Sequence, residues 1–257
     1  MNTLVKPQPR QAPPPGLLLH CGATQVGREE VFAVPTPRGT DTWFPLPHQD
    51  LVLEVESQLR DVGFTLEAQG HGLSHDGARY FGVLQVSLPD REPGDYSWIV
   101  GLRNSHDKSY PAGLVAGTHV LVCDNMSFSG EVRLSRKHTR HAARDLRHLT
   151  ARAVGQLGDR FHRLDERIAA YREDLVPDWA AHDLTIRAVD CRAITTSQIP
   201  AVLEHWRKPP HEEFRPRTLW SWFNCVTEVH KKVSPSTAMA RGEALHGLCD
   251  AVVGLAS

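Results

Sequence analysis

The stretch FTLEAQGHGLSHDGARYFGVLQVS, residues 64–87, decides the fold class, because its apolar residues alternate with polar ones. The alternation from Phe64 to Ala68 has the period of two that is typical of a half-buried strand. The segment Arg79–Ser87 predicts a second strand, and Asp76-Gly77 between the two has the composition of a tight hairpin turn. The stretch therefore predicts two antiparallel strands joined by a short turn.

Two further segments continue this pattern. The segment YSWIVGLR, from Tyr96 to Arg103, predicts a strand. The segment AGLVAGTHVLVC, from Ala112 to Cys123, predicts one strand, or two with a kink at Gly117. Together with the first pair they indicate a β-meander of about four strands. Two shorter strands are also expected nearer the start of the chain, at Leu17–Cys21 and Val31–Val34.

Helical periodicity appears on both sides of the meander. Before it, a helix is expected to open with Asp50 as its N-cap and to end at Gly63, where glycine fits a left-handed C-terminal position. After it, a helical pattern runs from about Lys137 to Asp174, with possible breaks at Gly155 and Gly158. Its heptad seam consists of Leu157, Phe161, Leu164, Ile168 and Tyr171.

The rest of the chain predicts short-looped helices. One of them follows Pro177, with Trp179, Ile186 and Val189 expected on its buried side. The overall expectation is an α+β fold: an antiparallel β-meander packed on helices, a long basic helix after the sheet, and a helical C-terminal part. Residues 1–15, with five prolines, predict a disordered tail, and residues 16–257 a single domain. Within that domain, residues 16–132 are expected to be mainly β with one helix, and residues 133–257 helical.

Charge is distributed unevenly along the chain. The 29 Lys and Arg residues and 30 Asp and Glu residues give a net charge of −1, yet residues 133–172 contain eleven basic and four acidic residues. That segment therefore carries +7 and the remainder −8. On a helix, Arg140, Arg144 and Arg147 fall within about 60° of one another. Guanidinium groups spaced along one face suit a phosphate backbone.

Composition excludes several classes of protein. No run of 18 apolar residues predicts a transmembrane helix, and residues 1–16 lack the apolar centre of a secretory signal, so a cytoplasmic location without membrane partners is expected. The five cysteines form no C-x-x-C pair, which favours reduced thiols over a zinc ribbon or redox motif. No glycine-rich phosphate loop of the P-loop or dinucleotide type occurs, and no cofactor is expected.

The sequence predicts a nucleic-acid-binding face without a catalytic group. Arg103 and Lys108 are expected on the loops of the meander. The other expected phosphate contacts are Arg133, Arg136, Lys137, Arg140, Arg144 and Arg147. Trp98, Tyr110 and Phe128 are candidates for stacking on bases, although burial in the core is the commoner use of such residues.

The loop Asn104-Ser105-His106-Asp107 contains the residue types of a catalytic triad. Triad side chains must converge in space, which neighbours in a turn rarely do, and a second Ser-His-Asp occurs at 74–76 between two other predicted strands. Polar turn chemistry at two hairpin tips accounts for both copies. A metal site at His138 and His141, with Cys123 or Asp124, is a further alternative, but spacing does not define its remaining ligands.

Five stretches resemble the phage- and plasmid-associated family Domain of Unknown Function 932, and the central one, with its SHD loop, is the most specific. They are DGARYFGVLQV (76–86), VGLRNSHDKSYPAGLVAG (100–117), VLVCDNMSFSGEV (120–132), RKHTR (136–140) and RTLWSWFNCVTEV (217–229). The resemblance covers residues 20 to 250 and implies a bacterial mobile-element setting, without an activity or catalytic residues. The order of elements is also similar to that of phage single-strand annealing proteins of the Redβ and ERF type, which is an analogy of fold only.

Three functions remain open from the sequence. The first is a protein that binds nucleic acid, with single-stranded DNA as the expected partner, in strand annealing or as a replication or recombination accessory. The second is a hydrolytic or metal-dependent enzyme that uses the SHD loop. The third is a protein-interaction module that acts against a host defence. The seam from Leu157 to Tyr171 also permits a homo-oligomer.

Overall fold

The computed structural model describes residues 23–91, 94, 96–120, 125–128, 142–231, 233 and 235–255. Six strands in this part of the chain form one antiparallel sheet, and each strand pairs with the next one in sequence. They are β1 (Thr24–Val26), β2 (Thr65–Ser74), β3 (Arg79–Ser87), β4 (Tyr96–Ser105), β5 (Gly113–Val120) and β6 (Asn125–Phe128). The predicted meander is confirmed and extended by one strand at each edge.

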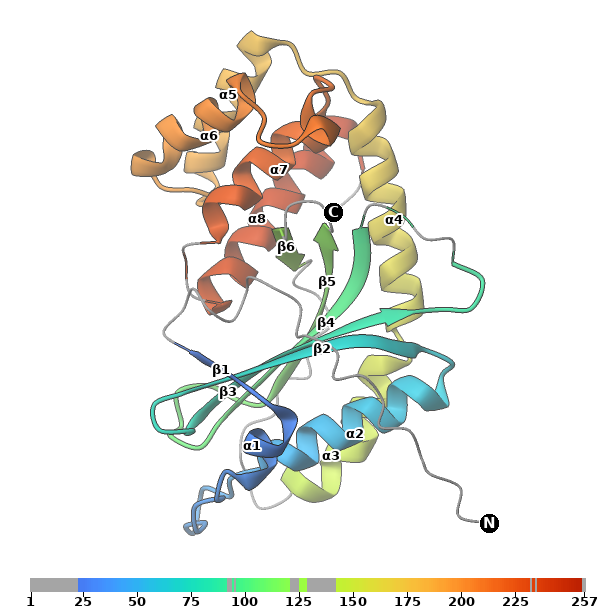
Figure 1. Ribbon diagram of the computed structural model, residues 1–257, viewed down its shortest axis with the longest axis vertical. Coiled ribbons are helices and arrows are strands. Elements are labelled where there is room, and N and C mark those ends of the chain that lie inside the picture. Colours follow the sequence, from blue (N-terminus) through green and yellow to red (C-terminus); the bar gives the residue numbers. More distant parts are fainter. Residues whose placement is uncertain are drawn as a thin grey trace, which may run out of the picture.

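The helices cover the sheet in two groups (Figure 1). Near the N-terminal strands are α1 (Arg28–Ala33), α2 (His48–Asp61) and α3 (Ala142–Val154). The second group gathers beside β5 and β6 and consists of α5 (Asp178–Asp190), α6 (Ile199–Arg207), α7 (Leu219–His230) and α8 (Pro235–Val253), with short 3-10 turns at Thr196–Gln198 and Glu212–Phe214. The helix α4 (Leu157–Glu173) runs between the two groups. This arrangement confirms the α+β class.

The β2–β3 turn forms as its composition predicts. Asp76 and Gly77 have φ angles of 53° and 82°, and the Ala78 N–H donates to the His75 carbonyl at 3.0 Å. Positive φ at both central positions is the geometry that matches the twist of paired strands, and Gly77 adopts it at no steric cost.

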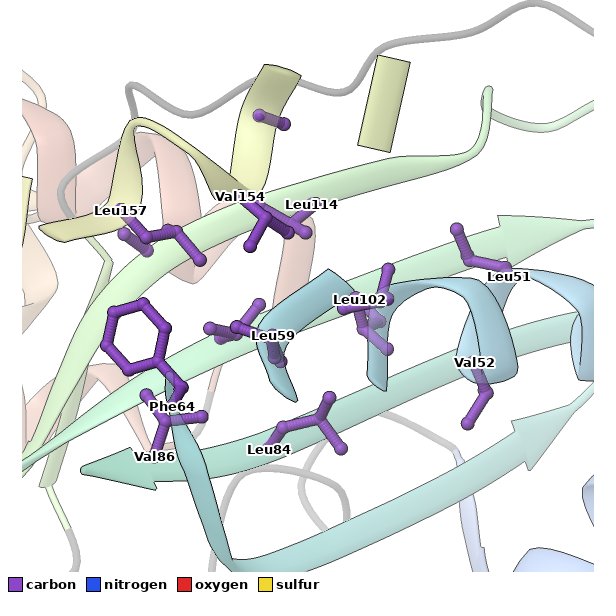
Figure 2. Close-up of a cluster of buried hydrophobic side chains, with 14 of the residues drawn as sticks. Leu51, Val52, Leu59, Phe64, Leu84, Val86, Leu102, Leu114, Val154 and Leu157 are labelled. Carbon is purple, nitrogen blue, oxygen red and sulfur yellow. The ribbon is translucent and has the colours of Figure 1, made fainter. Parts of the chain in front are cut away.

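The first hydrophobic core lies between the sheet and the α2–α3 pair. Leu51, Val52 and Leu59 of α2 are fully buried against alternate residues of the strands, among them Leu84 and Leu102 (Figure 2). Because successive strand residues point to opposite faces, this one face collects the apolar half of the alternating pattern. Burial of each such side chain contributes about 1.5–3 kcal/mol.

The predicted heptad seam joins this core to a second one. All five seam residues of α4 are buried. Phe161 and Leu164 pack in the first core, whereas Ile168 and Tyr171 pack among the C-terminal helices. Phe161 stacks on Trp98 with 4.7 Å between ring centres. The seam is therefore occupied by packing within the chain.

The long helix predicted after the sheet is divided into two. It breaks after Val154, and the Gly155 N–H still donates to Ala151 O at 2.9 Å before α4 begins at Leu157. The sequence identified Gly155 as such a position, in agreement with the low helix propensity of glycine. Residues 137–141, also expected in this helix, lie outside the described residues.

Two predictions about the N-terminal half are wrong. Val31–Val34 does not form a strand, because Glu30 accepts a hydrogen bond from the Gly27 N–H at 2.9 Å and so closes the first turn of α1. Asp50 does not cap α2, which begins two residues earlier after Pro47; instead its carboxylate lies in the first helical turn. The strand expected at Leu17–Cys21 lies outside the described residues.

The buried side of α5 also differs from the prediction. Trp179 and Ile186 are 74% and 52% exposed, whereas Ala181 and Ala188 are fully buried. Small residues allow α5 to approach α6 and α8 closely, and Thr185 in the same face accepts a hydrogen bond from Trp222 Nε1 at 3.2 Å. The spacing of apolar residues predicted that the large side chains Trp179 and Ile186 would be buried. The close packing of α5 against its neighbours instead buries the small residues Ala181 and Ala188.

Candidate functional site

The SHD loop begins with Ser105, the last residue of β4, and its three side chains point to different partners. Ser105 Oγ donates to Tyr110 O at 2.7 Å and accepts from Tyr110 N at 3.2 Å. His106 Nε2 is 2.9 Å from Leu46 O. Asp107 accepts from Arg79 Nε at 2.6 Å. These residues do not converge on a common point, so their geometry is that of a braced turn and not of a triad.

Electrostatics agree with a structural role for Asp107. Burial opposes ionisation of this carboxyl, but hydrogen bonds from the Ser109 side chain and backbone and from Arg79 outweigh it and hold its pKa at about 2. A carboxylate that remains ionised and paired at neutral pH is not available as a general acid.

The second Ser-His-Asp copy forms the tip of the β2–β3 hairpin. His75 is exposed, has a φ of 54°, and its Nδ1 lies 3.3 Å from Ser74 Oγ. The following Asp76 and Gly77 provide the turn described above. The recurrence of the tripeptide is thus explained by turn formation at both sites.

A buried polar cluster lies beneath the SHD loop and includes Asn104, His106 and His48. The His48 and His106 rings stack with 3.9 Å between centres and 3° between planes. Asn104 Nδ2 donates to Leu46 O at 2.8 Å and lies 2.9 Å from His48 Nδ1. His48 Nε2 reaches Gly77 O at 2.9 Å, so Nε2 carries the proton and Nδ1 accepts from Asn104. The cluster ties the start of α2 to two strand ends.

A second buried network was not predicted from the sequence. Glu56, 1% exposed, pairs with Arg28 through both carboxylate oxygens and with Arg60 at 3.1 Å. Arg28 also donates to Gln69 Oε1 at 3.3 Å, and His71 Nε2 lies 3.0 Å from the same oxygen.

This network ends at a tyrosine in the sheet. Tyr80 is completely buried, and its hydroxyl lies 2.9 Å from His71 Nδ1. Burial is the main cause that raises the pKa of Tyr80, so its hydroxyl remains a donor. The available signal was Glu56 itself, a charged residue four positions after Val52 on the apolar face of α2.

On α3, Arg147 is the predicted phosphate contact whose side chain is described, and Arg152, which was not among the predicted contacts, is exposed on the same helix. Arg147 and Arg152 are exposed, opposite the buried Leu146, Ala153 and Val154. Among the described residues neither guanidinium has an ion pair or hydrogen bond. Arg144 lies in the same helix, but its side chain is outside the described part of the structure. The remaining predicted contacts Arg133, Arg136, Lys137 and Arg140 also fall outside it.

The meander contributes its two predicted cations at a different place. Arg103 lies over the Tyr110 ring at 5.7 Å, and Lys108 Nζ is 5.0 Å from the Trp43 ring centre. The neighbours of Arg103 in β4 point to the face covered by α2 and α3, so Arg103 points to the opposite face. The structure therefore does not bring Arg103 and Arg147 onto one face of the sheet.

The stacking candidates have different environments. Trp98 is 6% exposed and belongs to the core, and its Nε1 donates to Asp165 at 2.9 Å. Tyr110 is half-buried against Phe81, with 5.5 Å between ring centres. The Phe128 side chain lies outside the described part of the structure. Tyr96, which was not predicted, is half-buried between Arg91 and Arg172 at 5.0 and 5.6 Å.

The metal alternative falls largely beyond the described chain. His138, His141, Cys123 and Asp124 are outside the described residues. Within residues that are described, no group of three or more His, Cys, Asp or Glu side chains is arranged to hold a metal ion. No helix in this part of the chain is both long and apolar enough to cross a bilayer.

Comparison with known proteins supports the resemblance seen in the sequence. No curated protein and no solved structure matches the chain. One family model, described as Domain of unknown function (DUF932), matches residues 40–247 and so spans strands β2 to β6, the SHD loop and most of the C-terminal helices. With so much of its length matched, the chain belongs to the DUF932 family.

Proposed function

We propose that this protein binds nucleic acid, with single-stranded DNA as the first candidate, through a basic face centred on α3. The observation that carries the proposal is the pair of exposed arginines Arg147 and Arg152, which have no acidic partner among the described residues. Guanidinium groups bind phosphate oxygens in pairs of parallel hydrogen bonds.

Because the long helix is divided into α3 and α4, the net positive charge can be assigned to the part before α4. Residues 133–154 carry six of the seven net positive charges of the 133–172 segment, because three of its four acids lie in α4. Within α3 there are three arginines and one aspartate, and α4 is neutral. At 100° per residue, Arg144, Arg147 and Arg152 fan over about 140° of the helix surface. This spread of positive charge suits the flexible phosphate backbone of a single strand that passes across the helix.

The acidic remainder leaves this face uncovered in the described part of the chain. Asp250 of α8 pairs with Arg167 of α4 at 2.9 Å, on the side that packs against the C-terminal helices. Asp165, also in α4, accepts from Tyr96 and Trp98. Neither carboxylate is engaged with α3. A strand-annealing or mobile-element role is a narrower version of this proposal and rests on the same face.

Salt-dependent binding tests the proposal. Replacing Arg147 and Arg152 with Ala should weaken binding of a 20-nucleotide single strand about tenfold or more, because charge-assisted hydrogen bonds are lost. The slope of log K against log salt concentration should become shallower by about 1.4, or about 0.7 for each lost phosphate contact. Fluorescence anisotropy over a range of salt concentrations measures both quantities.

A matched control removes the same charge elsewhere. Arg187 and Arg192 are exposed, and Arg187 belongs to α5, which has three aspartates and one arginine. Their double Ala variant should bind with unchanged affinity and slope. If the α3 variant keeps both the affinity and the slope of the unmodified protein, the proposed face is wrong.

A further inference from the structure

A cleft of about 520 Å³ opens where the start of β2, the end of β3 and the start of β4 lie side by side. Its polar lining comes from Thr65, Glu67, Gln85, Ser87, Arg91 and Ser97. Leu84, Val86 and Trp98 point into the core under α2 and α3. Their strand neighbours Gln85, Ser87 and Ser97 therefore lie on the other face of the sheet. The polar wall of the cleft therefore faces away from the helix-covered core, which the cleft borders at Val86. Its volume is in the range of small-ligand sites.

One group in the cleft is buried without a partner. Ser97 is 7% exposed, and its hydroxyl has no hydrogen bond in the structure, although it lines the cleft. Buried hydroxyls in folded proteins are nearly always hydrogen-bonded, so an unmet one at a cavity wall indicates a place for a ligand atom. The amide of Gln85, one strand away, likewise has no hydrogen bond to a described residue.

The opposite wall is built by a local irregularity of the sheet. The β2–β3 register shifts between Leu66 and Ala68, and the bulge places Glu67 beside Ser87, whose Oγ donates to its carboxylate at 2.5 Å. Bulges re-aim a side chain that a regular strand would point elsewhere. The second carboxylate oxygen of Glu67 can then accept a hydrogen bond from a ligand in the cleft. The Gln85 amide can both donate and accept there.

The rim carries a planar cation and an aromatic ring. Arg91 lies over Trp98 at 4.3 Å and over Tyr96 at 5.0 Å, and it pairs with Asp165 at 3.7 Å. Arg172 of α4 is exposed and lies 5.6 Å from the Tyr96 ring centre. Glu67 already accepts from Ser87, and Arg91 already pairs with Asp165. The lining groups without a partner, Ser97 and Gln85, are neutral, so the interior suits a neutral polar group.

We propose that this cleft binds one nucleobase of a bound strand, with the edge of the base on Ser97 and Gln85. Bases present donors and acceptors along a planar edge, and proteins that read single strands use such edges together with arginine planes and aromatic rings. The inference rests on the proposed nucleic-acid binding and identifies a position where bases are distinguished from one another.

Homopolymers of the four deoxynucleotides, each 20 nucleotides long, are suitable probes for the full chain. Ser97→Ala and Gln85→Ala should each weaken binding of the preferred homopolymer about fivefold, the effect of one lost hydrogen bond. Neither should change the salt slope, because no phosphate contact is lost. Gln49→Ala, an exposed change on α2, is the matched control, and thermal melting checks that each variant is folded.

The outcomes separate this inference from the proposed function. If the α3 variant loses affinity while Ser97→Ala and Gln85→Ala bind all four homopolymers normally, the cleft inference is overturned and the proposed function stands. Deoxynucleoside monophosphates, titrated by calorimetry, cover the other case. Binding that depends on Ser97 and Gln85, without any oligonucleotide binding, supports the cleft and overturns the α3 face. If neither kind of probe binds, both proposals fail.

Discussion

Lowering the pH from 7 to 4 is expected to remove several kcal/mol from the free energy of unfolding. Three of the buried histidines have pKa values well below the usual range and are neutral at pH 7: His71 in the sheet, His230 at the end of α7, and His246 in α8. Burial is the main cause that lowers their pKa values from 6.5, to about 4 for His71 and His230 and to about 3 for His246.

The direction of the effect follows from which state binds more protons. Below about pH 6.5 the unfolded chain protonates these histidines, while the folded chain does not until about pH 4 or 3. Stability is therefore complete above pH 6.5 and falls as the pH decreases through this window. A pKa difference of 2.5 corresponds to about 3 kcal/mol for each of His71 and His230.

Nearby arginines add to the free-energy cost of protonating these buried histidines. Arg28 acts on His71, Arg241 on His230, and Arg167 on His246. Urea unfolding at a series of pH values gives the free energies, and the unfolding midpoint should fall steeply below pH 6.5. Replacing His230 with Gln should lower the number of protons taken up on unfolding by about one, and with it the slope of the unfolding free energy against pH. Replacing the exposed His148 is the control, and that slope should stay as it is in the unmodified protein. A stability that is constant from pH 7 to pH 4 contradicts the burial of neutral histidines.

Gly82→Ala is expected to destabilise the protein by about 3 kcal/mol, as overpacking of a filled core does. The fully buried Tyr80 ring folds across residue 82 on the same face of β3. A Cβ there would lie 2.8 Å from Tyr80 Cζ and closer still to the hydroxyl. The ring cannot move away easily, because its hydroxyl is hydrogen-bonded to His71 within the buried network.

Two variants make this prediction specific. Gly158→Ala in α4 meets no atom within 4 Å, so it should stabilise the helix by about 0.5–1 kcal/mol instead. In a Tyr80→Ala background, Gly82→Ala should cost little, and the coupling between the two positions would be about 2–3 kcal/mol. Additive effects of the two changes in urea unfolding would show that the Tyr80 ring is not what excludes a side chain at residue 82.

The elements with regular periodicity are the ones that sequence reasoning identified best. The apolar face that begins with Phe64 and Leu66 and the 4-3-4-3 spacing from Leu157 to Tyr171 appear as predicted, because burial of one face imposes the period. The predicted alternation does not continue to Ala68, because the bulge after Leu66 pairs Ala68 with Gln85 and so turns it to the other face of the sheet. The turn at Asp76-Gly77 and the end of α2 near Gly63, with φ of 92°, follow from backbone conformations that glycine favours. Periodicity and glycine conformation depend on neighbouring residues, so the pattern of a short segment is enough to predict them.

Sequence reasoning failed where a partner far along the chain decides the outcome. The buried face of α5 is set by how closely α6 and α8 approach its alanines, and no pattern within residues 178–190 contains that distance. The SHD residues are adjacent in sequence, yet Leu46, Arg79 and Tyr110 draw their side chains apart. Glu56 is tolerated on an apolar face only because Arg28 and Arg60 reach it.

The candidate binding site divides in the same way. The amino-acid sequence alone determined the strands of the meander, the seam of α4 and the concentration of positive charge before and within α3, because each depends on the order of residue types. Only the tertiary structure decided that Arg103 faces away from α3, that the C-terminal acids of the described chain pair elsewhere, and that a β-bulge, Gln85 and Ser97 enclose a polar cleft. Those features depend on contacts between segments distant in sequence, whose geometry emerges only when the strands and helices pack.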